Sequence, residues 1–263
     1  MDGCKSIIIG PSDANRPLRR SFMPNVYVVP TKDALRTDRR TDASVIVLDI
    51  IFATTSMVAA LESGASRIVP ALDLEEAEQL AKGYATGSWI LAGEKYSESF
   101  PGYHSYEPLG LIGPEMAGKT LVYATTNGTV ALRRAHFFPD VYIANLRNGP
   151  AVVRHLLARR RASADIVILC SGSRGHFSLE DFYGAGYIVH CLRQMARDTL
   201  NYSDAAIAAE LAFEGTDPRE VLMASRVGRM MCDRGFGRSI DYASELDVCR
   251  LVAVYREGFV VAV

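Results

Sequence analysis

Val45-Ile46-Val47-Leu48-Asp49 is the stretch of sequence that decides the fold. Four consecutive apolar residues, three of them β-branched, are typical of a strand covered on both faces, as in a parallel sheet between helices. The carboxylate that closes the run marks the strand's carboxyl end. A buried carboxylate costs on the order of several kcal/mol unless it is paired, metal-bound or at the rim of the sheet. Asp49 is therefore either a functional residue or a cap for the turn that follows.

The same combination of a short apolar run and a helical pattern recurs along the chain. We expect further strands at residues 67–69, 89–92, 120–124, 141–144 and 165–170, and helices at residues 74–84, 129–135, 150–161 and 181–198. Such alternation predicts a three-layer α/β/α fold with a largely parallel central sheet.

The last third of the chain has a different pattern. It becomes helical from Ser203 onward, which predicts a helical C-terminal part, and residues 250–263 are expected to return as one or two edge strands. No change in composition suggests a linker. We therefore predict a single domain over residues 25–263, preceded by a ragged N-terminal extension over residues 1–24.

The composition limits the classes of function. The chain has 263 residues, 49% of them apolar, and its net charge is −1. This balance argues against a nucleic-acid partner and against an anionic membrane surface, and the apolar runs are too short to cross a bilayer. The five cysteines include no C-x-x-C pair, which argues against structural zinc and disulfides and favours a reducing, cytoplasmic location. A small-molecule ligand is the expected partner, and a homodimer is compatible with the sequence.

Polar residues follow the expected strands at their carboxyl ends, where open α/β sheets bind ligands. Asp49 closes one strand, and Gly93-Glu94-Lys95 closes another, although this tripeptide also suits a surface turn with an ordinary ion pair. Asn148 precedes an expected helix and is a candidate for a helix cap or a ligand contact. Together these positions predict a polar site at one edge of the sheet.

Thr125-Thr126-Asn127-Gly128-Thr129 lies between a strand and a helix. Glycine lets the backbone approach a ligand closely, and the free N–H groups of a new helix bind phosphate-type oxygens well. The alternative is a plain helix cap, since threonine or asparagine followed by glycine is common there. The density of donors favours an anion site.

A second polar turn, Ser171-Gly172, precedes two acidic residues, Glu180 and Asp181. The small residues of the turn again allow a ligand to approach the backbone. Ser178-x-x-Asp181 resembles a capping box, and both acids suit the start of a helix. They are equally suited to hold a hard cation through oxygen ligands.

Taken in order, these segments resemble the 2-phosphosulfolactate phosphatase (ComB-like) family, from about residue 25 to the C-terminus. Its two specific motifs are T-T-N-G-T at residues 125–129 and F-S-L-E-D at residues 177–181. Shorter matches accompany them: Leu48-Asp49, Ala53-Thr54-Thr55, Gly64-Ala65, Ala92-Gly93-Glu94, Ala131-Leu132, Asn148, Cys170-x-Gly172, Ala185-Gly186 and Leu246-Asp247-Val248.

The resemblance implies an α/β/α fold, a requirement for Mg²⁺ and hydrolysis of a phosphate ester on a small, doubly anionic acid. The implied catalytic residues are Asp49, Glu94 and Asp181. The implied Mg²⁺ ligands are Asp49, Glu94, Glu180 and Asp181. The implied contacts to phosphate or substrate are Thr125, Thr126, Asn127, Gly128, Thr129, Asn148, Ser171, Gly172 and Lys95. The nucleophile, a carboxylate or water, stays open.

Several positions depart from the family's pattern. Phe52 and Lys95 stand where the family has arginine, and Gly102-Tyr103-His104 replaces G-F-D. We therefore expect a substrate that is still phosphorylated but less anionic, and larger or aromatic. The aromatic residues that suggest this are Phe52, Tyr96, Phe100, Tyr103 and Tyr106. Two alternatives stay open: a catalytically silent member that binds an anion, and a lyase or isomerase acting on a phosphorylated substrate.

Overall fold

Strand β2 (Ser44–Leu48) contains the apolar run of residues 45–48, and every one of its residues is buried. A computed structural model describes residues 23–36, 42–196 and 198–263 of the chain. The predicted N-terminal extension lies almost wholly outside these residues. β2 lies between two parallel neighbours, β7 and β8, so that its backbone is hydrogen-bonded on both sides. This is the environment that a continuous apolar run predicts.

One mixed sheet runs through the described residues in the order β5-β4-β6-β3-β11-β10-β7-β2-β8-β1-β9. Besides β2, its strands are β1 (Asn25–Val29), β3 (Arg67–Ala71), β4 (Trp89–Lys95), β5 (Glu98–Ser99), β6 (Thr120–Ala124), β7 (Asp140–Ala144), β8 (Ile166–Cys170), β9 (Asn201–Tyr202), β10 (Ala253–Arg256) and β11 (Phe259–Ala262).

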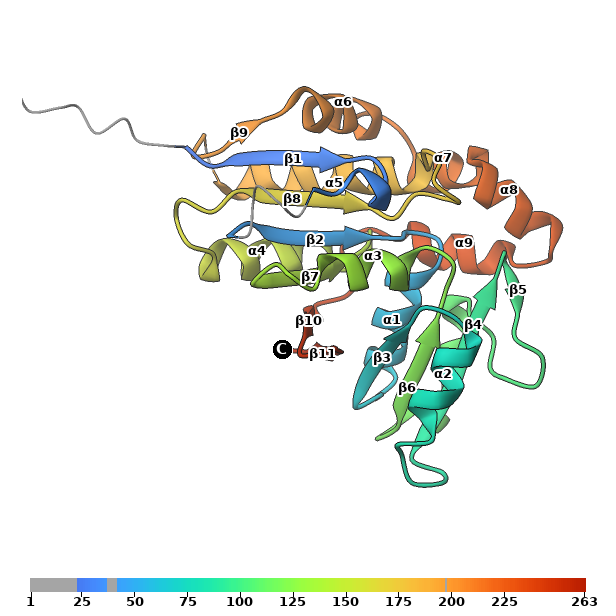
Figure 1. Cartoon of the computed structure of the whole chain (residues 1–263). Helices are drawn as coiled ribbons and strands as arrows, with labels where there is room; N and C mark the ends of the chain where they lie inside the picture. The colour runs from blue at the N-terminus through green and yellow to red at the C-terminus, as the bar shows by residue number, and fades with distance from the viewer. Residues whose placement is uncertain (1–22, 37–41, 197) are drawn as a thin grey trace, which may run out of the picture.

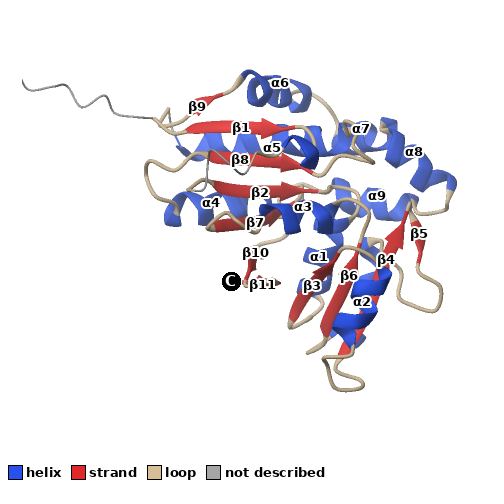
Figure 2. Cartoon of the chain, in the orientation of Figure 1, coloured by secondary structure: helices blue, strands red, loops and turns tan. Residues whose placement is uncertain are grey.

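The α-helices alternate with the strands up to β9 and then follow one another. They are α1 (Ala53–Glu62), α2 (Leu74–Ala81), α3 (Gly128–Ala135), α4 (Gly149–Arg159), α5 (Leu179–Ala196), α6 (Asp204–Phe213), α7 (Pro218–Ala224), α8 (Arg226–Asp233) and α9 (Gly237–Ser244). Short 3-10 turns are η1 (Lys32–Ala34), η2 (Pro108–Leu111) and η3 (Pro114–Met116). In Figure 2, α2 and α3 lie in front of the strands and α4 and α5 behind them. The predicted α/β fold with a mostly parallel sheet and a helical C-terminal part is confirmed.

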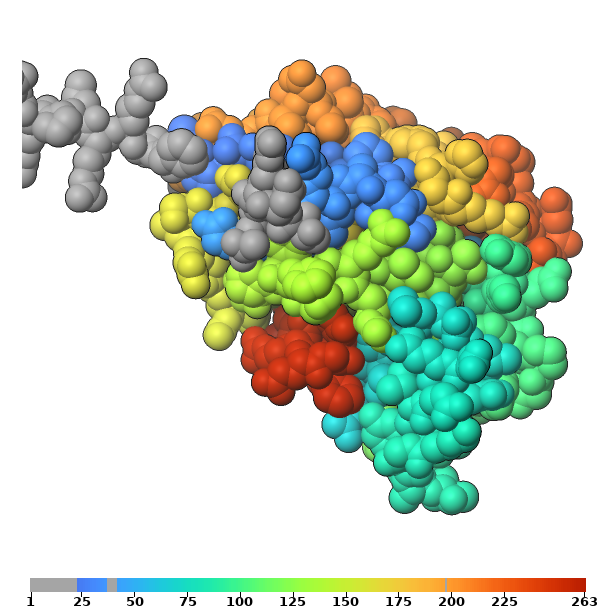
Figure 3. All heavy atoms as spheres, viewed as in Figure 1, coloured from blue at the N-terminus to red at the C-terminus, as the bar shows by residue number. Residues whose placement is uncertain are grey.

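The C-terminal hairpin corrects the prediction of edge strands at residues 250–263. β10 pairs with β7 and β11 pairs with β3, both antiparallel, so the hairpin lies inside the sheet. It joins the parallel group β4-β6-β3 to the parallel group β7-β2-β8-β1-β9. Figure 3 shows the hairpin, in red, between the green and cyan parts of the surface. An apolar run near a chain end does not reveal whether one or both of its sides are paired, which is why the sequence-based prediction of an edge position is wrong.

The hairpin also sets the direction of the two strand groups. Because each hairpin strand is antiparallel to the group it joins and to its partner, the two groups run in opposite senses. The sheet bends at this point, and Figure 1 shows the arrowheads of β2 and β8 and that of β4 directed toward one region near α8 and α9. The carboxyl ends of both groups therefore meet at one place.

Strand β4 is longer than the sequence predicts, because it continues through Gly93 and Glu94 to Lys95. A side chain at position 93 would lie 2.3 Å from the Ala124 carbonyl oxygen and 2.5 Å from the Phe100 ring. Glycine therefore lets β6 and the Phe100 ring approach this strand. The alternative reading of these residues as a surface turn is therefore wrong, because they are part of the sheet and Glu94 is buried.

Within the described ranges, no helix combines the length and apolar character needed to cross a membrane.

The central position of the hairpin predicts a stability effect. Val260 of β11 is fully buried and pairs with Ile68 of β3, whereas Val263 is 57% exposed. Val260→Ala should lower the free energy of unfolding by about 1–3 kcal/mol, the range for removing buried methyl groups. Val263→Ala serves as the control and should change it by less than about 0.5 kcal/mol. Equal, small effects in urea denaturation would contradict the central placement.

Candidate functional site

A pocket opens where the carboxyl ends of the two strand groups meet. Its walls come from the residues that follow β2, β4, β6 and β8, from the first turn of α5 and from α8. The residues lining it are Asp49, Phe52, Glu94, Tyr96, Ser97, Thr126, Asn127, Gly172, Ser173, Arg174, Ser178, Glu180, Asp181, Arg226, Val227 and Met230. All four carboxylates that the sequence singled out therefore lie in one pocket, although they are up to 132 positions apart in the chain.

Asp49 is buried at the end of β2, where its carboxylate accepts a hydrogen bond from the Ala53 N–H. Gly128 packs against it, and a side chain at that position would lie 2.6 Å from Asp49 Oδ2. Burial raises the pKa of Asp49 to about 7, and repulsion from Glu94 and Glu180 adds to the shift. Asp49 thus caps the turn, as one reading of the sequence predicts. It also lines the pocket, where burial and the neighbouring carboxylates disfavour its charged form.

Asp181 connects the start of α5 to two strand ends. Its Oδ1 accepts the N–H of Ile50 at 2.9 Å, and its Oδ2 accepts the N–H of Gly172 at 3.0 Å. These bonds replace the capping box with Ser178 that the sequence suggests, and that interpretation is wrong. Burial raises the pKa of Asp181 above its usual range, and the charges of Asp49 and Glu180 act in the same direction.

Glu94 fastens two loops of the pocket together. Its Oε1 accepts the Thr126 N–H at 2.6 Å, and its Oε2 accepts the Thr126 hydroxyl at 3.1 Å and the Ser97 N–H at 2.5 Å. The carboxylate therefore takes up one backbone donor of the loop that was expected to bind phosphate. Glu180 also lines the pocket, and only 4% of it is exposed.

The Thr125–Thr129 loop divides into a structural part and a pocket-facing part. The N–H of Thr125 donates to the Thr129 hydroxyl at 3.0 Å, and the N–H of Thr129 donates to the Thr125 hydroxyl at 3.1 Å. Both side chains are buried, so these two threonines fix the start of α3. Thr126 and Asn127 line the pocket, and Gly128 lets the loop approach Asp49.

Lys32 is a site-forming residue that the sequence did not suggest. It lies in η1 after β1, and only 6% of it is exposed. Its ammonium donates to Asn127 Oδ1 at 2.8 Å and to the Ser171 carbonyl at 3.2 Å. Burial lowers the pKa of Lys32, while the nearby charges of Asp33, Asp49 and Asp181 oppose that shift. A single lysine in a polar segment gives no sequence signal for this role.

Two further cations were also missed, Arg174 and Arg226. The Arg174 guanidinium lies 4.7 Å from the centroid of the Tyr96 ring, and Arg226 Nη2 donates to the Ser173 hydroxyl. Arg226 comes from α8, far from the strand ends in sequence. Only the packing of the C-terminal helices over the sheet brings it here.

Asn148 does not line the pocket. Its Oδ1 accepts the Asn145 N–H at 2.9 Å, and its Nδ2 donates to the carbonyls of Ile143 at 3.3 Å and Leu251 at 3.2 Å. Its side chain makes no helix-cap bond. The fully buried amide joins the end of β7 to the segment before β10.

Two other predicted contacts also lie outside the pocket lining. Ser171 is fully buried, and its hydroxyl has no hydrogen-bond partner among the described residues. Lys95 is exposed, with its ammonium 5.9 Å from the centroid of the Tyr96 ring. Only Gly172 of the predicted Ser171-Gly172 turn lines the pocket.

The aromatic residues that suggested a larger substrate are dispersed. Phe52 and Tyr96 line the pocket. Phe100 and Tyr106 are buried in the core, and the Tyr103 hydroxyl donates to Glu78 at 2.8 Å outside it. The pocket therefore has two aromatic walls rather than an aromatic lining.

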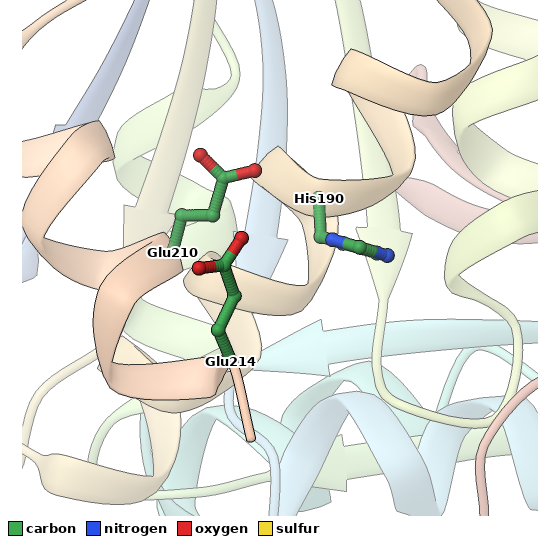
Figure 4. A group of neighbouring side chains, drawn as sticks. All are labelled: His190, Glu210 and Glu214. Carbon is green, nitrogen blue, oxygen red and sulfur yellow. The ribbon is translucent and has the colours of Figure 1, made fainter. Parts of the chain in front are cut away.

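A second group of ligand-type side chains lies between α5 and α6 (Figure 4). Among the described residues, His190, Glu210 and Glu214 are the one trio of His, Cys, Asp or Glu ligand atoms that all lie within 4.8 Å of one another. Glu210 already pairs with Arg193 Nε at 2.5 Å, and the ring of His190 extends away from the two glutamates in Figure 4. This arrangement is a salt bridge with a neighbouring histidine, and the carboxylates of the pocket are spaced more widely.

The sequence of the chain is similar to those of one family of known proteins. The model of the 2-phosphosulpholactate phosphatase family matches residues 29–258. A "Probable 2-phosphosulfolactate phosphatase" of Clostridium tetani is 29% identical over 238 residues, which cover 90% of this chain and 99% of the relative. Proteins of the same name from Symbiobacterium thermophilum and Deinococcus radiodurans are 34% and 36% identical, over 82% and 81% of this chain and 92% and 88% of their own lengths.

The chain belongs to the 2-phosphosulfolactate phosphatase family, a family of phosphoric monoester hydrolases. The resemblance predicted from T-T-N-G-T and F-S-L-E-D is confirmed.

The pKa of Asp49 predicts how stability depends on pH. Because the folded-state value of about 7 lies above the usual 3.8, the stability that the protonated form provides is lost as pH rises toward and through 7. Asp49→Asn keeps an acceptor for the Ala53 N–H and removes the charge. With EDTA at pH 8 the variant should melt at least about 2 °C higher than the wild type, since about 1 kcal/mol corresponds to 2–4 °C in a chain of this size.

At pH 5 the difference between the two proteins should shrink, because Asp49 is then protonated. Asp204→Asn, which neutralises an exposed acid at the start of α6, is the matched control and should show no such pH dependence. A lower melting temperature of Asp49→Asn at pH 8 would contradict the repulsion described here.

Proposed function

We propose that the chain is a Mg²⁺-dependent phosphatase that hydrolyses a phosphate monoester of a small molecule, 2-phosphosulfolactate or a related phosphorylated acid. One observation carries the proposal: a single pocket combines four carboxylates with hydrogen-bond donors and cations. A metal ion and an anionic ester need these two kinds of group side by side. The names of the relatives agree with this reading.

The donor set fits Mg²⁺. The pocket-lining carboxylates offer hard oxygen ligands, and no histidine or cysteine lines the pocket among the described residues. The pKa of Asp49 is raised mainly by burial and then by the charges of Glu94 and Glu180, and a divalent cation would favour its charged form. Mg²⁺ is usually held by one or two carboxylates together with water and phosphate oxygens, so the four acids need not form a closed cage.

The hydrogen bonds of the four acids indicate which of them are most available to bind a metal ion. Glu94 and Asp181 already accept hydrogen bonds from backbone N–H groups at both oxygens, and they position the loops that they join. Asp49 and Glu180 are therefore the first candidates for metal ligands, with the remaining lone pairs of Glu94 and Asp181 directed to the same cation. When bound, the cation would screen the phosphoryl oxygens and stabilise the charge that develops as the ester bond breaks.

Asn127 is the proposed donor to the phosphate. Its Oδ1 accepts bonds from Lys32 at 2.8 Å and from the Arg174 N–H at 3.1 Å. Two donors on the oxygen fix the orientation of the amide, so that its Nδ2 remains available as a donor in the pocket. Lys32 thus positions Asn127 and balances the charge of the carboxylates behind it.

We infer that the reaction takes place in the cytoplasm. The cysteines of the described residues, Cys170, Cys191, Cys232 and Cys249, are all free thiols, in keeping with a reducing compartment. The oligomeric state, including a homodimer, is open to measurement by light scattering.

Hydrolysis should require both the cation and the pocket acids. The wild type should release inorganic phosphate from 2-phosphosulfolactate or another phosphorylated hydroxy acid with Mg²⁺, and EDTA should abolish release. Glu180→Gln and Asp49→Asn should each lower kcat at least about 100-fold, as expected when a ligand to a catalytic cation is lost. Asp204→Asn should keep the wild-type rate.

Phosphorus NMR of the products separates this activity from its alternatives. Inorganic phosphate supports hydrolysis, whereas a retained ester on a changed carbon skeleton would indicate a lyase or isomerase. No turnover of any ester, with the Deinococcus relative active in the same assay, would contradict the proposal.

A further inference from the structure

Two arginines face the pocket without a carboxylate partner, although four carboxylates line the same pocket. In the described part of the chain, neither Arg174 nor Arg226 forms an ion pair within 4.0 Å, as six other arginines do. Their contacts are with neutral groups: Arg174 with the Tyr96 ring and Arg226 with the Ser173 hydroxyl. The lining of the pocket therefore contains acids and guanidinium groups that are not paired with one another.

Two of the four acids are occupied by hydrogen bonds of their own. Asp181 is bonded to the N–H groups of Ile50 and Gly172, and Glu94 is bonded to Thr126 and Ser97. Folding thus satisfies these two carboxylates with backbone donors, and neither guanidinium group is taken up by a carboxylate. An arginine fork binds carboxylate, sulfonate or phosphate oxygens through two parallel N–H bonds.

Arg226 is held in place by a well-anchored helix. It is the first residue of α8, and the preceding Ser225 hydroxyl accepts the Gly228 N–H at 2.9 Å. A side chain at Gly228 would lie 1.8 Å from the Leu222 carbonyl oxygen, so α8 packs directly on α7. Val227 and Met231 are buried beneath the helix. The backbone position of Arg226 is therefore set by helix packing, and its exposed side chain is held toward the pocket by the bond to Ser173.

The surroundings of Arg226 indicate the size and character of the ligand. Val227 and Met230 of α8 line the pocket beside it, and Phe52 lines the same pocket from the β2–α1 turn. These apolar side chains suit a short carbon skeleton between the phosphate and a second polar group.

We propose that Arg226, assisted by Arg174, binds a second anionic group of the substrate, one carried on its carbon skeleton rather than on the transferred phosphoryl group. Arg226 is then a specificity-determining residue of the pocket. This inference rests on the proposed phosphatase function. It revises the expectation of a less anionic substrate. That expectation came from Phe52, which stands where the family has arginine. Helix α8 supplies a guanidinium to the same pocket through Arg226.

The test compares two esters that differ in one group, 2-phosphoglycerate and glycerol 2-phosphate, in which a hydroxymethyl group replaces the carboxylate. Calorimetry with Mg²⁺ should show that the wild type binds 2-phosphoglycerate at least about tenfold more tightly, the factor expected for one charge-assisted hydrogen bond. Arg226→Met should remove this preference while leaving the affinity for glycerol 2-phosphate within about twofold. Arg226→Lys should recover part of it.

Arg229→Met is the matched control, because Arg229 is an exposed arginine of the same helix that does not line the pocket. It should retain the wild-type preference. If the esters are turned over, KM for 2-phosphoglycerate should rise in Arg226→Met with kcat changed less than about threefold, the signature of lost ground-state binding.

Two results would overturn the proposal: a wild type that does not prefer 2-phosphoglycerate, or an Arg226→Met variant that keeps the preference. A failure of the proposed phosphatase function would give a different result. The binding preference would still depend on Arg226, but no ester would release phosphate.

Discussion

The structure depends on one constraint, the burial of like charges at the ends of parallel strands. Asp49, Glu94, Glu180 and Asp181 lie in one pocket, and burial together with mutual repulsion raises the pKa of Asp49 to about 7. Such an arrangement costs stability, and it persists because backbone N–H groups and the buried Lys32 oppose the repulsion. A pocket of acids that are only partly neutralised favours the binding of a cation. Carboxylates with perturbed pKa values in a pocket are also a recognised indication of a functional site.

The pocket also requires that the carboxyl ends of two separate strand groups meet. The acids come from two strand groups of opposite direction, and they meet because the C-terminal hairpin joins these groups inside a bent sheet. The last residues of the chain thus complete the framework on which residues near positions 49, 94, 126 and 172 converge. The same path brings α8 over the pocket with Arg226 at its first position. The carboxylates and Arg226 are consequently held by different parts of the chain.

The sequence predicts most of the fold and the acidic half of the site. Short apolar runs and helical periodicity locate β2, β3, β4, β6, β7 and β8 but not β1 or β5. Polar residues that follow these strands identify the four carboxylates and the Thr126–Asn127 turn. What the sequence misses depends on long-range packing. No local pattern distinguishes a central hairpin from an edge hairpin, or reveals that Lys32 and Arg226 reach the pocket. Local patterns also mislead at Asp181, where a spacing typical of a capping box hides bonds to Ile50 and Gly172.

The central claim is that the pocket acids bind a divalent cation, and electron paramagnetic resonance of Mn²⁺, which replaces Mg²⁺ and has a distinct spectrum when free, tests it most directly. On this account the chain binds Mn²⁺ saturably at pH 8, Mg²⁺ competes for the same site, and the affinity falls as pH drops below 7 because Asp49 takes up a proton. Added inorganic phosphate should tighten the binding, and Asp49→Asn should weaken it at least about tenfold. Absence of saturable binding at pH 8, or binding that is unchanged in Asp49→Asn, would contradict the account.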